Sequence, residues 1–355
     1  MPEARAARGL ASRLLRPLTS IVLGLWLIVG VTGCGPHRPL ELAGPTMGTS
    51  YSIKIVDPPG ELHMDRLADQ VTRELDNLVA LFSTYDPSSE LATFNRVRRT
   101  DWETVSAALV NVLTEARQVS ELTDGAFDVT VGPLVELWGF GPDESGDRIP
   151  SDAEIARLRT RVGYTGLELR ASPPALRKQD PDIHVDLSAI AKGYAVDRLA
   201  LLLESHGISN YLVEIGGELR GRGHNGAGEP WRIGIEQPVT GARNVHAIIA
   251  IDSTGVATSG DYRNYFETQG QRYSHTIDPR TGRPVTHALA SVTVISPLTM
   301  RADALATALM VLGPEEGYAL ADREGLAALF IVRTADGLVD RQTTAFARHR
   351  LDRNT

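Results

Sequence analysis

Apolar side chains recur at helical spacing in several stretches of this chain. Residues 64–81 show the pattern most clearly, with apolar side chains every three or four positions at Leu67, Val71, Leu75, Leu78 and Leu81. The same spacing predicts further helices over residues 104–122, 151–162, 192–207 and 300–312. In the third of these five helices, Ser151 and Glu154 form a pair that typically caps a helix start. Gly207 ends the fourth.

Short apolar or alternating runs predict strands between these helices. They cover residues 51–56, 183–187, 211–215, 231–236, 247–252, 291–295 and 326–332. Residues 57–60 predict a turn and residues 171–182 a surface loop. Helices and strands mix without a regular βαβ order, and no Pro- or Gly-rich linker divides them. The pattern therefore predicts one compact α+β domain over residues 45–355.

The first 33 residues differ from the rest of the chain. A start rich in arginine precedes an apolar run at residues 21–31, and small residues precede Cys34. This layout predicts a secretory signal peptide over 1–33. It resembles a bacterial lipobox, in which Cys34 receives a lipid, with 34–44 as a tether. The alternative is a membrane-spanning anchor with an incidental cysteine, but the run is shorter than the roughly 20 residues that spanning needs.

Export and charge narrow the possible functions. We expect a lipid-anchored protein on the periplasmic side of a bacterial cell envelope, with no cysteine after Cys34 for a disulfide. The net charge is −8 for the whole chain, and removing the four Arg and one Glu of residues 1–33 leaves −11. So acidic a domain is a poor candidate for binding nucleic acid. It would bind a phosphate ligand only through local groups or a metal.

Polar and aromatic residues concentrate at 257–285, a stretch too polar for a pair of core strands and too aromatic for an idle loop. Residues 278–282 read Asp-Pro-Arg-Thr-Gly and predict a turn, because Pro presets one backbone angle, Asp bonds the backbone ahead and Gly accepts positive φ. Such a turn can hold His275 and Ile277 against a ligand. His275 is the best general base by residue type, although a single histidine in a turn is often structural.

Three further motifs suggest chemistry. Asp303 and Thr307 are four residues apart on a predicted helix, so both oxygens can bind one hard cation such as Mg²⁺. The alternative is that the helix dipole favours Asp303 in the first turn and Thr307 only packs. Lys192, at another helix start, faces a phosphate or is a solvated surface residue. Gly216 and Gly217 form a tight turn or admit a ligand close to the backbone.

Nine segments together resemble the ApbE family, the FAD:protein FMN transferases. They occur in the family's order and cover nearly all of the chain after residue 45: TMGT at 46–49, FSTYDPSSE at 82–90, GAFDVT at 125–130, PLVELWGFG at 133–141, DLSAIAKGYAVD at 186–197, NYLVEIGGE at 210–218, SGDYRNYF at 259–266, SHTIDPRTG at 274–282 and ADALATAL at 302–309.

The resemblance implies an α+β fold with FAD in a cleft and transfer of FMN to a threonine hydroxyl of a target flavoprotein, with release of AMP. Targets would be membrane redox complexes carrying a Ser/Thr-Gly-Ala-type motif. By position, Mg²⁺ would bind Asp303, Thr307 and the Ala189 carbonyl, and His275 would be the base. The implied FAD contacts are Met47, Tyr85, Ala126, Phe127, Asp128, Asp186, Lys192 and Ile277.

Two other functions stay open. In one, water replaces threonine and the protein is a Mg²⁺-dependent FAD pyrophosphatase that yields FMN and AMP. In the other, it is a lipoprotein that binds FAD without catalysis. Asp303, Thr307 and His275 are all present, which favours an enzyme.

Overall fold

The computed structural model describes residues 38–141, 149–239, 244–262, 265–268 and 271–352. The predicted signal peptide and Cys34 lie outside these ranges. None of the helices within them is both long and apolar enough to cross a membrane.

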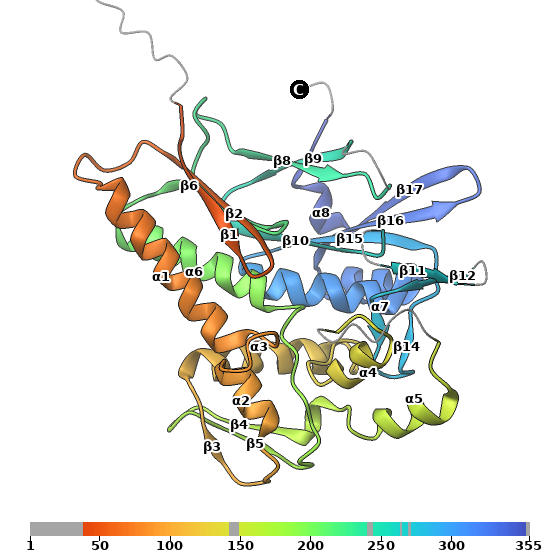
Figure 1. Cartoon of the computed structure of the whole chain (residues 1–355). Helices are drawn as coiled ribbons and strands as arrows, with labels where there is room; N and C mark the ends of the chain where they lie inside the picture. Colours follow the sequence, from red (N-terminus) through yellow and green to blue (C-terminus); the bar gives the residue numbers. More distant parts are fainter. Residues whose placement is uncertain (1–37, 142–148, 240–243, 263–264, 269–270, 353–355) are drawn as a thin grey trace, which may run out of the picture. The chain divides into compact units, whose positions relative to one another are not determined.

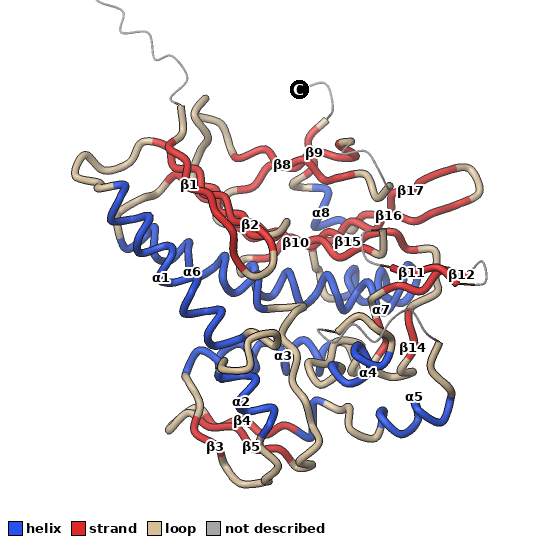
Figure 2. Tube along the Cα trace, viewed as in Figure 1, coloured by secondary structure: helices blue, strands red, loops and turns tan. Residues whose placement is uncertain are grey.

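An antiparallel sheet of eight strands forms the centre of the described fold (Figures 1 and 2). Each strand pairs with its neighbours in antiparallel register. In spatial order the strands are β1 (Leu40–Thr46), β2 (Thr49–Val56), β6 (Asn210–Ile215), β7 (Glu218–Arg222), β10 (Thr254–Gly260), β15 (Leu289–Ser296), β16 (Ala327–Thr334) and β17 (Gly337–Gln342).

Different elements cover the two faces of this sheet. Four helices pack on one face and form the main core with it: α1 (Met64–Phe82), α3 (Ala107–Leu122), α6 (Ala191–Ser205) and α7 (Thr299–Arg323). A small sheet of β18 (Arg350–Leu351), β9 (Val245–Ile251) and β8 (Trp231–Glu236), with α8 (Thr344–Ala347), forms a second core on the other face. In β15, Val292 packs in the first core and Ile295 in the second, so all eight of its residues are buried.

The remaining elements lie at the edge of the helical layer. One group consists of α2 (Glu90–Arg96), η1 (Tyr164–Gly166) and a small sheet of β3 (Glu103–Thr104), β5 (Ala175–Lys178) and β4 (Leu167–Arg170). A second group surrounds a third apolar cluster and includes α4 (Gly132–Leu137), α5 (Asp152–Arg159) and two hairpins, β11 (Tyr265–Thr268) with β12 (Gln271–Ser274), and β13 (Ile277–Asp278) with β14 (Arg283–Pro284).

The predicted α+β class and all five predicted helices are confirmed. Both arms of the capping box of Ser151 and Glu154 are present, and Gly207 follows α6 at φ 74°. The helix predicted to end at residue 312 is followed by Gly313, whose backbone is not helical at φ 82°, and a second helical segment then continues α7 to Arg323.

Four predictions from local pattern are wrong. Residues 183–187 form no strand, because the Asn95 side chain bonds both the N–H and the C=O of Val185 in place of a neighbouring strand. The predicted loop 171–182 contains β5. Residues 40–44, placed in the tether, belong to β1. The polar stretch starting at 257 begins inside a core strand, where Ala257 is fully buried.

Helices α6 and α7 are in backbone contact at Gly193. A Cβ added there would lie 2.5 Å from the carbonyl oxygen of Thr299 and 2.7 Å from the Cα of Met300. We therefore expect Gly193→Ala to lower the free energy of unfolding by about 1–3 kcal/mol, measured by urea denaturation. Leu201→Ala is the matched control on the same helix, because Leu201 is 57% exposed. An equally small loss in both variants would contradict this close contact.

Candidate functional site

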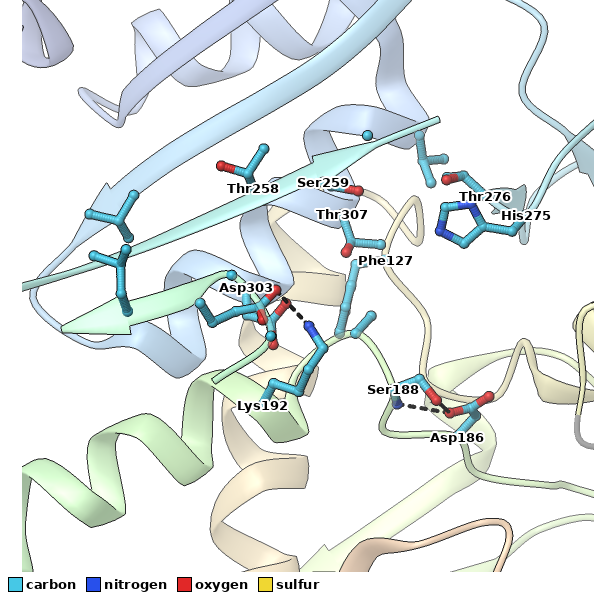
Figure 3. A pocket seen from close by; sticks show the side chains of 18 of the residues that line it. Phe127, Asp186, Ser188, Lys192, Thr258, Ser259, His275, Thr276, Asp303 and Thr307 are labelled. Carbon is cyan, nitrogen blue, oxygen red and sulfur yellow. Dashed lines mark hydrogen bonds and ion pairs between the residues drawn. The ribbon is translucent and has the colours of Figure 1, made fainter. Parts of the chain in front are cut away.

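A cleft of about 730 Å³ opens where the β6–β7 hairpin ends and β10 continues past it. One wall is formed by the starts of α6 and α7, and a second by the loop that follows α3. Residues of β2, β6, β7, β8 and β10 and the segment from His275 to Pro279 also line the cleft. Figure 3 shows Lys192, Asp303 and Thr307 from the first wall and His275 across from them.

The start of α7 is held by a side chain from α6. Asp197 is buried and accepts hydrogen bonds from the backbone N–H groups of Thr299 and Met300, each at 3.0 Å. A carboxylate there satisfies the free donors and complements the helix dipole. Arg220 donates to the same carboxylate at 3.0 Å. Asp197 thereby fixes the helix that carries Asp303 and Thr307.

Asp303 connects the two helices. The N–H of Gly193 donates to Asp303 Oδ2 at 3.0 Å, rather than to the carbonyl of Ala189 four residues earlier. Ala189, Asp303 and Thr307 all line the cleft, and their carbonyl, carboxylate and hydroxyl groups supply oxygen donors. Oxygen donors of this kind suit Mg²⁺, with open positions left for phosphate or water. The described residues contain no cluster of three or more His, Cys, Asp or Glu that would suit a metal with several charged ligands.

A buried charge cluster surrounds Asp303. Lys192 Nζ lies 2.5 Å from Glu218 Oε1, and the carboxylates of Glu218 and Asp303 are nearly inaccessible to solvent. Burial raises the pKa of Glu218 to about 7, against the opposing charge of Lys192. Burial also raises the pKa of Asp303. Burial alone would lower the pKa of Lys192, but the charges of Asp303 and Glu218 raise it, so the lysine stays a cation.

Two other carboxylates shape the loops of the cleft. Asp128 is buried and accepts hydrogen bonds from the N–H and hydroxyl of Thr130 and from the N–H of Tyr164. Asp186 accepts from the N–H of Ser188 at 2.8 Å and from its hydroxyl at 2.6 Å, which forms a turn leading into α6 (Figure 3). Both side chains are therefore engaged in holding the backbone that lines the cleft.

His275 is supported by an aromatic cluster. Its ring meets the edge of Phe140 at 6.3 Å between centroids, and Phe140 stacks on Phe266. Trp138 is buried in the same cluster, and its indole N–H donates to the carbonyl of Gly282 at 2.9 Å. The predicted turn at 278–282 is confirmed, since the N–H of Arg280 bonds Asp278 Oδ1 and Gly282 has φ 73°.

The cleft brings together most of the predicted site residues. Those that line it are Tyr85, Ala126, Phe127, Asp128, Asp186, Ala189, Lys192, His275, Ile277, Asp303 and Thr307. Met47 is not among the lining residues and lies in the β1–β2 turn, packed against the main core. Cys34 lies outside the described residues. Gly216 and Gly217 form the tight β6–β7 turn, and they also line the cleft, where a ligand can approach the backbone.

Several residues of the site escaped sequence analysis. Glu218 partners Lys192, Asp197 fixes α7, and Thr258 and Ser259 of β10 line the cleft. The carboxylates occur in motifs quoted above, but their partners are distant in sequence. Thr258 and Ser259 belong to the polar stretch 257–285, but sequence analysis assigned neither of them a role.

Comparison with known proteins agrees with the fold and the cleft. The ApbE family model matches residues 47–330. The chain belongs to the ApbE family. A protein from Vibrio cholerae named FAD:protein FMN transferase is 46% identical over 317 residues, which are 89% of this chain and 94% of that protein.

Solved ApbE structures superpose closely on this chain. The flavin transferase ApbE from Vibrio cholerae matches with a TM-score of 0.82 and 44% identity, covering 88% of this chain and 100% of that one. The apo form of the flavinyl transferase ApbE from Pseudomonas stutzeri matches with a TM-score of 0.81 and 43% identity, covering 88% and 97%. The predicted ApbE fold is therefore confirmed.

A buried lysine of this ApbE chain supports the approach to Asp186. Lys178 is 1% exposed and donates to the carbonyls of Asn95 and Val97 at the end of α2. Burial lowers its pKa to about 8, an effect to which the charge of Arg98 adds. Since Asn95 holds Val185, Lys178 indirectly positions the segment that ends in Asp186.

Lys178→Met should lower the free energy of unfolding by about 1–3 kcal/mol, because two carbonyls lose their donor. The loss should grow as the pH rises from about 8 towards 10.5. In this range Lys178 has released its proton in the native wild type, whereas the unfolded chain still binds that proton. The stability of the wild type therefore increases with pH. Urea denaturation of both proteins across this range measures the difference. A loss that does not change with pH would contradict the lowered pKa of Lys178.

Proposed function

We propose that this protein transfers FMN from FAD to a threonine hydroxyl of a target flavoprotein and releases AMP. The arrangement of the cleft is the observation that carries the proposal: a cationic side chain and hard oxygen donors on α6 and α7 lie across from His275. The similar proteins named FAD:protein FMN transferase support the same reaction. It is an enzyme's task, since a stable pyrophosphate bond must break.

FAD would bind along the wall formed by the loop after α3 and the turn before α6. Tyr85 is 70% exposed at the cleft, so its ring is available to stack on a flat ligand. Lys192 keeps its positive charge and would face phosphate oxygens. The full proposed set of contacts is Met47, Tyr85, Ala126, Phe127, Asp128, Asp186, Lys192 and Ile277.

Asp303, Thr307 and the Ala189 carbonyl would hold Mg²⁺. When bound, the ion would neutralise charge on the pyrophosphate, which the acidic surface of this protein cannot do. The donor set fits, because Gly193 bonds Asp303 and leaves the Ala189 carbonyl without that helical partner.

In the transfer, the threonine Oγ forms a bond to the FMN phosphorus. The bond between that phosphorus and the bridging oxygen breaks, and AMP leaves with the oxygen. His275 would accept the proton of the hydroxyl. Its placement against Phe140 limits the positions that its ring can take, which suits a base that must be aligned with a nucleophile.

The decisive experiment follows the acceptor mass. The protein is incubated with FAD, Mg²⁺ and a domain bearing the threonine motif, and the products are read by mass spectrometry and chromatography. A gain of one FMN less water supports the transferase. Free FMN and AMP with an unmodified domain would indicate a pyrophosphatase instead. Unchanged FAD would indicate a flavin-binding protein.

His275→Ala should retain FAD affinity and slow transfer by about 10²–10⁴-fold, because it removes the general base. Flavin fluorescence titration measures FAD binding, and single-turnover labelling of the acceptor measures the rate. His224→Ala, at a histidine that does not line the cleft, is the control and should transfer at the wild-type rate. Normal transfer by His275→Ala would place the base elsewhere.

Asp303→Ala should lose both Mg²⁺ binding and most transfer, because it removes the only charged ligand of the proposed set. Calorimetric titration with Mg²⁺ alone gives a readout independent of activity. Asp322→Ala, at an exposed position of the same helix, is the control. Full transfer by Asp303→Ala without added Mg²⁺ would refute the metal site.

We further propose that the protein is anchored through lipid on Cys34, on the periplasmic side of the envelope, where membrane redox complexes would be its targets. The signal layout supports this. Cys34→Ser should move the protein from the membrane fraction to the soluble periplasmic fraction. Unchanged membrane association would instead support an uncleaved spanning anchor.

A further inference from the structure

Strand β10 has partners along only part of its length. On one side, β15 pairs with it from Gly255 to Gly260. On the other side, β7 pairs only with Thr254, Gly255 and Val256. Because β7 begins at Glu218 and the chain turns back at Gly216 and Gly217, the sheet has no strand beside residues 257–260. This vacant edge of β10 lines the cleft.

The backbone groups on the vacant edge can be identified from the ladder. The N–H of Asp261 donates to the carbonyl of Ala290, so odd-numbered residues at this end of β10 direct their groups towards β15. In an antiparallel ladder the direction alternates with each residue. Thr258 and Gly260 therefore direct their N–H and C=O groups to the vacant side. Within the described part of the chain, no other strand pairs there.

The space beside this edge is open. Thr258 is exposed, and Thr258, Ser259 and Gly260 all line the cleft. The Thr258 side chain does not close the edge, since its hydroxyl lies 2.8 Å from that of Thr293 on β15. An open edge of a strand with unpaired donors and acceptors is a template for a further strand.

We propose that the threonine-bearing segment of the target flavoprotein binds as an extended strand on this edge, taking the position that β7 leaves vacant. This inference rests on the proposed function. The proposed transfer requires such a binding site, because the polypeptide acceptor must enter the same cleft as FAD. In Figure 3 the strand that carries Thr258 and Ser259 passes by Thr307 and leads towards His275. A threonine on the added strand would thus lie between the proposed metal site and the proposed base.

A peptide fits this edge better than FAD does. Thr258 and Gly260 present donor and acceptor pairs about 7 Å apart, which is the two-residue repeat of a strand. Of the residues proposed to bind FAD, none lies on β10, and Ala126, Phe127, Asp128 and Asp186 lie in the loop after α3 and the turn before α6. Backbone pairing also tolerates different side chains, so one enzyme could modify several targets through a short motif.

The first test removes single backbone donors from the acceptor. Synthetic peptides with a threonine after a Ser-Gly-Ala triplet are N-methylated at one amide at a time, and FMN transfer by the wild-type protein is followed by mass spectrometry. Methylation of amides that face β10 should lower kcat/KM at least about fivefold. Methylation of the alternate amides should change it little, which makes each neighbouring position a matched control.

The outcomes separate the inference from the proposed function. Labelling of the unmodified peptide with an alternating methylation effect supports docking as a strand. Labelling without alternation refutes the strand but leaves the transferase intact. If neither the unmodified peptide nor a folded target domain is labelled, the proposed function fails, and the docking inference fails with it.

A second test locates the strand on β10. Cys34 is the only cysteine in the chain, so Thr258→Cys in a Cys34→Ser background presents one thiol. Acceptor peptides with one cysteine near the threonine should form disulfides with it at alternate positions. Yield should exceed that of Val339→Cys by at least about tenfold, because binding raises the local concentration. Val339 is 51% exposed on β17, the strand at the far edge of the sheet. Equal capture by both variants would refute the β10 edge.

Discussion

The hydrogen bond from the Gly193 N–H to the buried carboxylate of Asp303 is the contact on which the site depends. It can form only because α6 lacks a side chain at Gly193, which lets the two helices touch backbone to backbone. Asp197, one turn further along α6, holds the start of α7 through two more backbone donors. The two helices therefore behave as one rigid unit, and the cleft inherits its geometry from their contact.

Charge in the cleft is arranged to suit a polyanionic ligand. Asp303 and Glu218 are both buried, and each would be costly as an anion without a nearby cation. Lys192 is the cation near both carboxylates, and their negative charges keep it protonated. Lys192 alone does not compensate the charge of both buried carboxylates. The raised pKa of Glu218 reflects this imbalance. A divalent cation beside Asp303 would offset the excess negative charge of the two carboxylates and leave Lys192 able to face a phosphate.

The central sheet forms the other part of the site, because β7 pairs with only part of β10. The small sheet covers part of one face, the helices cover the other, and the β6–β7 hairpin stops short of the end of β10. The paired glycines, both at positive φ, turn the chain back before the hairpin reaches the end of β10. One interruption of the sheet thus provides a cleft wall and an edge on which a polypeptide can dock, close to the histidine held by the aromatic cluster.

The amino-acid sequence by itself determined the α+β class, five of the helices, the turn at 278–282 and, through the ApbE resemblance, a set of site residues most of which line the cleft. Local periodicity and turn chemistry suffice for these, because each depends on neighbours within a few residues. The sequence misplaced residues 183–187, because the bonding of Val185 depends on Asn95, which lies 90 residues earlier in the chain. Only the tertiary structure paired Lys192 with Glu218, placed Asp197 at the start of α7 and left the end of β10 without a neighbour on one side. These features arise between segments far apart in sequence, where burial and strand register decide which groups meet.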